Sequence, residues 1–161
     1  MKKKILTFGM VLVLATVLVM PGVVLGANTT EVTGDVTEGY TFTAPSAVSL
    51  GSMAPSATAY TANSTDGSLV GNNPAGYTVT GTDAKSTDKG YMVSGTDVLD
   101  SKHEISKDGT TYYYADTSVS FVDSTAPTDT AVSLYVKQLV AYDDPVATGY
   151  TITITFTVTP K

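Results

Sequence analysis

The sequence predicts an all-β protein with a single antiparallel β-sandwich, of the immunoglobulin-like Greek-key or jelly-roll type, over residues 28–161. Two observations favour this fold. From residue 28 onward the chain is rich in Thr, Ser, Val, Tyr, Gly and Asp, and strand-length runs alternate with turn residues. In addition, 161 residues are enough for one packed core but not for two ordinary domains.

The clearest predicted strand covers residues 150–158, where five large apolar or aromatic residues alternate with four threonines. Such a period of two places the apolar side chains on a core face and the threonines on a solvated face. Residues 132–140 give a second strong prediction, a single strand in which Val132, Leu134 and Val136 share a face, with Gln138 next in register.

Further strands are predicted at residues 38–44, 77–82 and 118–122. Residues 105–114 resemble a hairpin, because Asp108-Gly109 lies between two β-prone arms and glycine accepts the positive φ of such a turn. Residues 52–73, rich in Ser, Ala, Thr and Gly, are expected to be partly irregular.

The N-terminal segment predicts export. Three lysines precede an apolar run over residues 5–19, and Pro21-Gly22 and small residues follow. This order is typical of a cleavable signal helix, here residues 1–27. Its removal takes three of the nine lysines and none of the 15 acidic residues, so the exported domain is strongly acidic, with no stable membrane span after cleavage. The alternative is a retained membrane anchor over residues 5–27.

The composition excludes several classes of function. Without cysteine there is no disulfide, thiolate nucleophile or structural zinc site. Every basic residue other than His103 is lysine, so the bidentate fork that reads phosphates and base edges is missing, and nucleic acid is not an expected partner. We expect no cofactor and no enzymatic activity, because His103 lies near Asp100 and Glu104 without a G-x-S-x-G motif. We interpret it as an exposed polar residue beside the hairpin.

Several acidic pairs lie in predicted loops and could offer oxygen ligands to calcium. Because the D-x-[DN]-x-[DN]-G pattern is absent, they are weak calcium candidates, and solvation of the surface is the alternative. The candidate residues are Asp83, Asp88, Asp143 and Asp144. Two sequons make Asn28 and Asn63 possible glycosylation sites.

The run Tyr112-Tyr113-Tyr114 is the most unusual aromatic feature. Alternation sends Tyr113 to the face opposite its two neighbours, so at least one ring is expected to be exposed or at a sheet edge. Tyrosine rings suit stacking on sugars or filling an interface, while sealing the rim of the core is the alternative role.

Two short motifs resemble those of the WxL cell-wall-binding domains of Gram-positive surface proteins. The first is Gly76-Tyr77-Thr78-Val79, and the second is Phe156-Thr157-Val158 with Pro160 after it. Tyrosine and phenylalanine replace the two tryptophans of that family. The resemblance implies an all-β secreted domain and makes Tyr77, Val79, Phe156 and Val158 candidate wall-binding residues, in addition to Tyr113.

The sequence therefore favours a secreted, non-catalytic cell-surface protein that is wall-associated, structural or adhesive. Its expected partners are a cell-wall polymer or other surface proteins, with self-association open. A second hypothesis is a subunit of an extracellular fibre that assembles by strand addition, through the polar arm 28–38 or residues 150–158. Three more hypotheses stay open: a calcium-binding or glycan-binding module, an extracellular enzyme using the acidic loops, and an ice binder using the threonine face.

Overall fold

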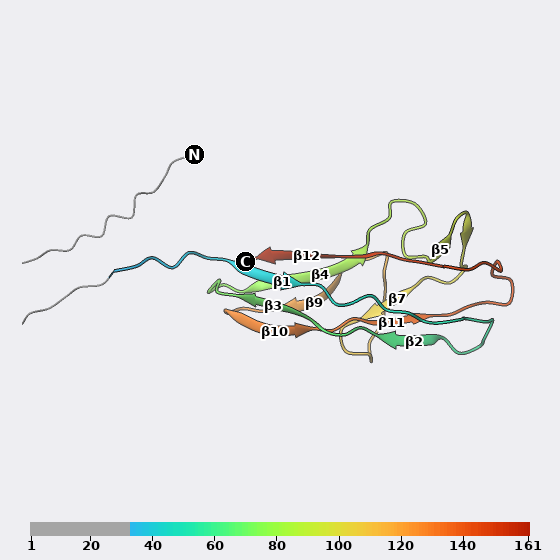
Figure 1. Cartoon of the computed structure of the whole chain (residues 1–161), viewed down its shortest axis with the longest axis horizontal. Coiled ribbons are helices and arrows are strands. Elements are labelled where there is room, and N and C mark those ends of the chain that lie inside the picture. Colours follow the sequence, from blue (N-terminus) through green and yellow to red (C-terminus); the bar gives the residue numbers. More distant parts are fainter. Residues whose placement is uncertain (1–32) are drawn as a thin grey trace, which may run out of the picture. The chain divides into compact units, whose positions relative to one another are not determined.

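The computed structural model describes residues 33–161, and every regular element in this part of the chain is a β-strand. The predicted signal helix and Asn28 lie outside the described residues. Twelve strands form several sheets in which all pairs are antiparallel (Figure 1). The all-β, antiparallel prediction is thus confirmed. A search of the described residues finds no helix long and apolar enough to cross a membrane.

Two three-stranded sheets form one half of this β-structure. The first contains β1 (Tyr40–Thr43), β3 (Gly67–Gly71) and β10 (Thr128–Val132), in the order β1-β3-β10. The second contains β12 (Ile154–Pro160), β4 (Tyr77–Asp83) and β9 (Val119–Asp123), in the order β12-β4-β9. Aromatic rings join the two sheets: the centroids of Phe42 and Phe156 lie 6.0 Å apart and those of Tyr40 and Tyr77 lie 5.6 Å apart.

A four-stranded sheet continues the structure beyond these two. It contains β2 (Tyr60–Asn63), β11 (Tyr135–Gln138), β7 (Glu104–Ser106) and β8 (Tyr113–Tyr114), in the order β2-β11-β7-β8. A small hairpin is formed by β5 (Val93–Ser94) and β6 (Asp97–Val98). Figure 1 places β2, β11 and β7 toward one end and the three-stranded sheets toward the other.

One hydrophobic core connects the three larger sheets. Its buried members are Leu69, Tyr77, Val79, Ile105, Ala115, Val119, Phe121, Val132, Leu134 and Val136. A smaller cluster of Met92, Leu99 and Val140 lies beneath the β5–β6 hairpin and the neighbouring loops. Because apolar burial is the dominant favourable term in folding, these clusters fix the sheets on which the exposed polar groups are mounted.

The alternation predicted for residues 150–158 is confirmed, although the strand bounds differ. Tyr150, Ile152, Ile154, Phe156 and Val158 are half-buried and the threonines between them are exposed. The ladder with β4 begins only at Ile154 and continues to Pro160. Before it, Thr151 forms an isolated bridge to Val93 of the small hairpin, so this stretch pairs with a different partner.

The prediction of a single strand over residues 132–140 is wrong. Alternate residues from Val132 to Val140 are buried as expected, but the chain changes sheet in the middle. Val132 ends β10, opposite Gly67, whereas Tyr135 begins β11, opposite Asn63. Between them, the backbone of Leu134 exchanges hydrogen bonds with Ser64. A period of two in the sequence indicates which face of a strand is buried. It does not indicate which other strand pairs with that strand.

The remaining strand predictions have mixed outcomes. Strands at 38–44, 77–82 and 118–122 are confirmed with shifts of one or two residues as β1, β4 and β9. Residues 52–73, expected to be partly irregular, contain both β2 and β3. The threonine, serine and glycine of this stretch do not by themselves predict strands. The two strands form because β3 pairs with β10 and β2 pairs with β11, both far along the chain.

The hairpin predicted at 105–114 is confirmed as β7 and β8, with Gly109 at a φ of 70°. Asp108 caps its turn by accepting hydrogen bonds from the backbone N–H groups of Thr110 and Thr111 at 2.8 and 3.0 Å. These bonds, with further ones from the hydroxyls of Thr110 and Ser106, hold the pKa of Asp108 well below its usual range.

Tyr77 ties the start of β1 to the second sheet. Its hydroxyl donates to the carbonyl of Gly39 at 2.8 Å and accepts from the N–H of Asn73 at 3.0 Å. Asn72 holds the same segment, because its side chain accepts from Gly39 N–H at 2.7 Å and donates to the carbonyl of Thr37 at 2.9 Å. The chain therefore enters β1 beside the end of β12, where Pro160 pairs with Tyr77.

Candidate functional site

The outer face of the four-stranded sheet carries a row of polar and aromatic side chains. In the register of this sheet, Thr61, Lys137, Glu104 and Tyr114 are successive neighbours on β2, β11, β7 and β8. Neighbouring residues across a ladder share a face. The inward-facing row of the same strands contains Ile105 and other core residues, so the first row points away from the core. We call this surface the lysine–tyrosine face.

Two lysines on this face are each held by a carboxylate and by tyrosine rings. The ammonium group of Lys102 lies 2.5 Å from Asp116, and its nitrogen is 5.8 Å from the ring centroid of Tyr91 and 5.6 Å from that of Tyr114. These distances are in the range of cation–π attraction. The hydrogen bond to Asp116 raises the pKa of Lys102 above its usual value, so this side chain stays charged in neutral solution.

Lys137 repeats the arrangement on the neighbouring strand. It forms an ion pair with Glu104, directly opposite on β7, and its nitrogen lies 5.2 Å from the ring centroid of Tyr112. Part-exposed ion pairs of this kind contribute little to stability, about 0–1 kcal/mol. Their effect here is positional, since they fix donors and acceptors beside flat aromatic rings.

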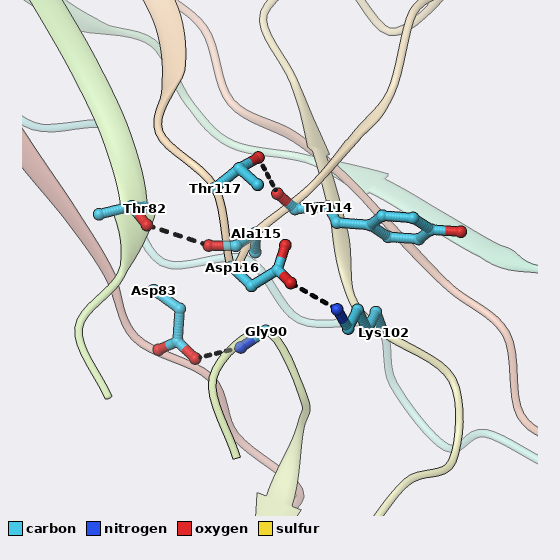
Figure 2. Close-up of polar contacts among 8 residues, drawn as sticks. All are labelled: Thr82, Asp83, Gly90, Lys102, Tyr114, Ala115, Asp116 and Thr117. Atoms are coloured by element: carbon cyan, nitrogen blue, oxygen red, sulfur yellow. Dashed lines mark hydrogen bonds and ion pairs between the residues drawn. The ribbon is translucent and has the colours of Figure 1, made fainter. Parts of the chain in front are cut away.

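The backbone that carries Tyr114 is held tightly (Figure 2). The Tyr114 carbonyl accepts hydrogen bonds from the N–H and the hydroxyl of Thr117 at 3.2 and 2.9 Å. The next carbonyl, of Ala115, accepts from the N–H of Asp83 at 2.7 Å and from the hydroxyl of Thr82 at 3.2 Å. The Tyr114 ring points away from this anchored turn and is 53% exposed. Because the backbone beneath the ring is already held, binding a ligand here adds little cost of ordering the backbone.

An open cleft of about 610 Å³ runs along the lysine–tyrosine face. Its lining residues are Ala57, Ala59, Asp100, Ser101, Lys102, Glu104, Tyr114, Lys137 and Leu139. The cleft thus combines an aromatic wall, two ammonium groups, two carboxylates and a hydroxyl.

The charge balance of the cleft selects among ligands. The two lysines are already paired, with Asp116 and Glu104, and Asp100 adds another negative charge to the lining. No excess of positive charge remains to bind a polyanion. Hydroxyl groups, which donate and accept, match paired ammonium and carboxylate groups better, and the less polar faces of sugar rings match tyrosine.

The structure brings the two WxL-like motifs together. Tyr77 and Val79 on β4 lie opposite Pro160 and Val158 on β12, and Phe156 lies opposite Gly81. Tyr77 and Val79 are fully buried, while Phe156 and Val158 are half-buried against the core. These side chains pack inside the domain, so in the folded protein Tyr77 and Val79 present no surface to a polymer. Tyr113, by contrast, is 53% exposed at the edge of its sheet.

The four acidic calcium candidates lie in different settings. Asp83 is buried and accepts from the N–H groups of Gly90 and Lys85 at 2.7 and 3.1 Å. Asp144 is buried and accepts from the N–H groups of Asp100 and Ala141, both at 2.6 Å. The bonds of these two carboxylates hold loops in place.

Asp88 sits in a turn with a φ of 51°, and Asp143 is exposed. Among residues 33–161, no three His, Asp or Glu side chains gather as metal ligands would. Asn63, the sequon residue inside the described range, is exposed at the end of β2.

The interpretation of His103 as an exposed residue is wrong, because its side chain is only 2% exposed. Its Nδ1 lies 3.1 Å from the Gln138 Oε1. The Gln138 amide nitrogen already donates to the carbonyls of Ser101 and Leu139 at 2.9 and 2.7 Å, so its oxygen is free to accept from a protonated Nδ1. Burial lowers the pKa of His103. The hydrogen bond to Gln138 and the charges of Asp83 and Glu104 act in the opposite direction but only partly offset this effect.

This burial predicts a pH-dependent stability. Unfolded histidine has a pKa of about 6.5, and the folded value is lower, so below that pH the unfolded chain binds the proton more readily. The free energy of unfolding should therefore have its full value above pH ~6.5. It should decrease as the pH is lowered through ~6.5 toward the pKa of His103 in the folded protein. His103 is the only histidine, so urea titrations at closely spaced pH values isolate it. His103→Gln should lower stability at every pH but remove this slope, and an unchanged slope would contradict the assignment.

Sequence reasoning missed most of this site. Nothing in the sequence pairs Lys102 with Asp116 or Lys137 with Glu104, because strand order decides both contacts. The tyrosine run was the one available signal, and Tyr112 and Tyr114 do share a face with the lysines. Comparison with known proteins finds no matching family model, no similar curated protein and no similar solved structure.

Proposed function

We propose that this chain is a secreted, non-catalytic cell-surface protein, built as a single β-sandwich, that binds the sugar chain of a cell-wall polymer. The observation that carries the proposal is the lysine–tyrosine face, with an exposed Tyr114 ring on an anchored turn beside two paired lysines. The export signal and the WxL-like motifs, both expectations from the sequence, support the same location.

The binding mode follows from the side chains in the cleft. A sugar ring stacks its C–H face on Tyr114, and its hydroxyls exchange hydrogen bonds with Lys102, Lys137 and Glu104. Because these charges are already paired, binding should depend only weakly on salt, in contrast to binding driven by unpaired lysines.

The proposal is tested with the exported form of the full chain and with isolated peptidoglycan sacculi. Tyr114→Ala should weaken sedimentation with sacculi about tenfold, which corresponds to about 1.4 kcal/mol. Tyr142→Ala is the matched control, because Tyr142 is 86% exposed and does not line the cleft. Equal binding by both variants and the unmodified protein would reject the lysine–tyrosine face as the binding surface.

A further inference from the structure

A second, larger cavity of about 990 Å³ lies on another part of the domain. Two stretches of chain that are largely outside regular strands form its walls, residues 44–55 and residues 144–154. Its floor includes Met92, Leu99, Leu134, Val136 and Val140. We call this cavity the groove.

The walls of the groove resemble strands that lack a partner between them. On one wall Val48 and Leu50 are half-buried with exposed residues on either side, and on the other Tyr150, Ile152 and Ile154 alternate in the same way. No backbone hydrogen bond joins the two walls within residues 33–161. Next to them, β12 is an edge strand, paired on one side only, with β4. Half-buried apolar side chains beside a strand edge that is paired on one side only are suited to an added strand.

The same chain carries a segment with the matching pattern. In residues 30–37 the sequence is TEVTGDVT. If this segment is extended, Val32, Gly34 and Val36 fall on one face with Thr30, and the other face carries only charged or hydroxyl residues. Val36 is 89% exposed, although valine is among the residues most often buried. This segment, residues 30–37, is the arm.

The described part of the arm does not occupy the groove of its own molecule, because Val36 is exposed and does not line the groove. Thr37 is held beside Asn72, at the end of β1 where Pro160 of β12 pairs with Tyr77.

We propose that the groove receives the arm of a second copy of this chain as an added β-strand. Val32 and Val36 then pack on the half-buried apolar side chains of the walls, while Glu31 and Asp35 face the solvent. Because the arm and the groove are different surfaces of the chain, each added copy presents a new groove. Such a head-to-tail contact builds a linear assembly.

The test is light scattering on the exported form of the full chain over a concentration series, without any polysaccharide. The unmodified protein should form larger particles as its concentration rises. Val36→Asp should raise the concentration needed by at least about tenfold, since it places a charge in an apolar groove. Thr33→Asp is the matched control, with the same added charge on the solvent face of the arm, and should assemble like the unmodified protein.

A labelled peptide of residues 28–38 gives a second measurement by fluorescence anisotropy. It should bind the Val36→Asp protein, whose groove is intact, while a peptide with both valines replaced by aspartate should not. A monomer at every concentration together with no peptide binding overturns the proposal, as does equal assembly by Val36→Asp and Thr33→Asp. Tyr114→Ala should assemble normally, so failure of polymer binding and failure of assembly are distinguishable.

Discussion

Gly76→Ala should destabilise the protein by about 2–6 kcal/mol, the sum of backbone strain and a steric overlap. Gly76 has a φ of 90°, and a Cβ atom there would lie 2.2 Å from the carbonyl oxygen of Ser124. The clash is with backbone, which cannot rotate away. The result is measured as the free energy of unfolding in urea, followed by far-ultraviolet circular dichroism.

Gly95→Ala separates the two causes. Gly95 also has a positive φ, of 62°, but nothing lies within 4 Å of the Cβ position. This variant should lose only the conformational term, about 1–2 kcal/mol. Equal losses at the two glycines would show that the close approach of Ser124 contributes nothing.

Tyr77→Ala should cost about 3–5 kcal/mol, as expected for removing a large buried aromatic side chain. The ring is fully buried and lies so close to Gly71 that a Cβ atom there would be 2.4 Å from it. Tyr77→Phe keeps the ring but leaves the buried N–H of Asn73 without its acceptor, and should cost about 1–3 kcal/mol.

Tyr142→Ala is the control for both substitutions, because this tyrosine is 86% exposed and its loss should change stability by less than about 0.5 kcal/mol. The measurement is again urea unfolding. If Tyr77→Phe matched the unmodified protein, the hydroxyl bonds that hold the start of β1 would be energetically unimportant. Together, Gly76 and Tyr77 give the Gly-aromatic motif a structural explanation that is independent of polymer binding.

The sequence predicted side-chain faces well and neighbours poorly. The alternation of residues 150–158 and of residues 132–140 was recovered residue by residue, because burial on one face of a strand requires a period of two. The change of sheet between Val132 and Tyr135 was not predictable, since no local residue type marks it.

For the candidate sites too, the sequence indicated individual residues but not which residues lie together. The run of three tyrosines was noticed, but the candidate named from it was Tyr113, whereas Tyr114 lines the cleft. Lys102 and Lys137 become part of the site only through strand order. His103 was misplaced because a polar residue near charged neighbours usually lies on the surface, whereas here Gln138 satisfies it in the interior. The groove was invisible because its walls, residues 44–55 and 144–154, are distant in the sequence.

The proposed binding of a sugar chain by the lysine–tyrosine face can be located directly in solution. The most direct test is to titrate the isotope-labelled exported protein with an N-acetylglucosamine oligosaccharide and to map amide shifts by nuclear magnetic resonance. We predict shifts at residues 101–104, 112–117 and 137, the segments that form and support the cleft. No shift there, or shifts confined to the groove at residues 44–55 and 144–154, would contradict sugar binding by the lysine–tyrosine face.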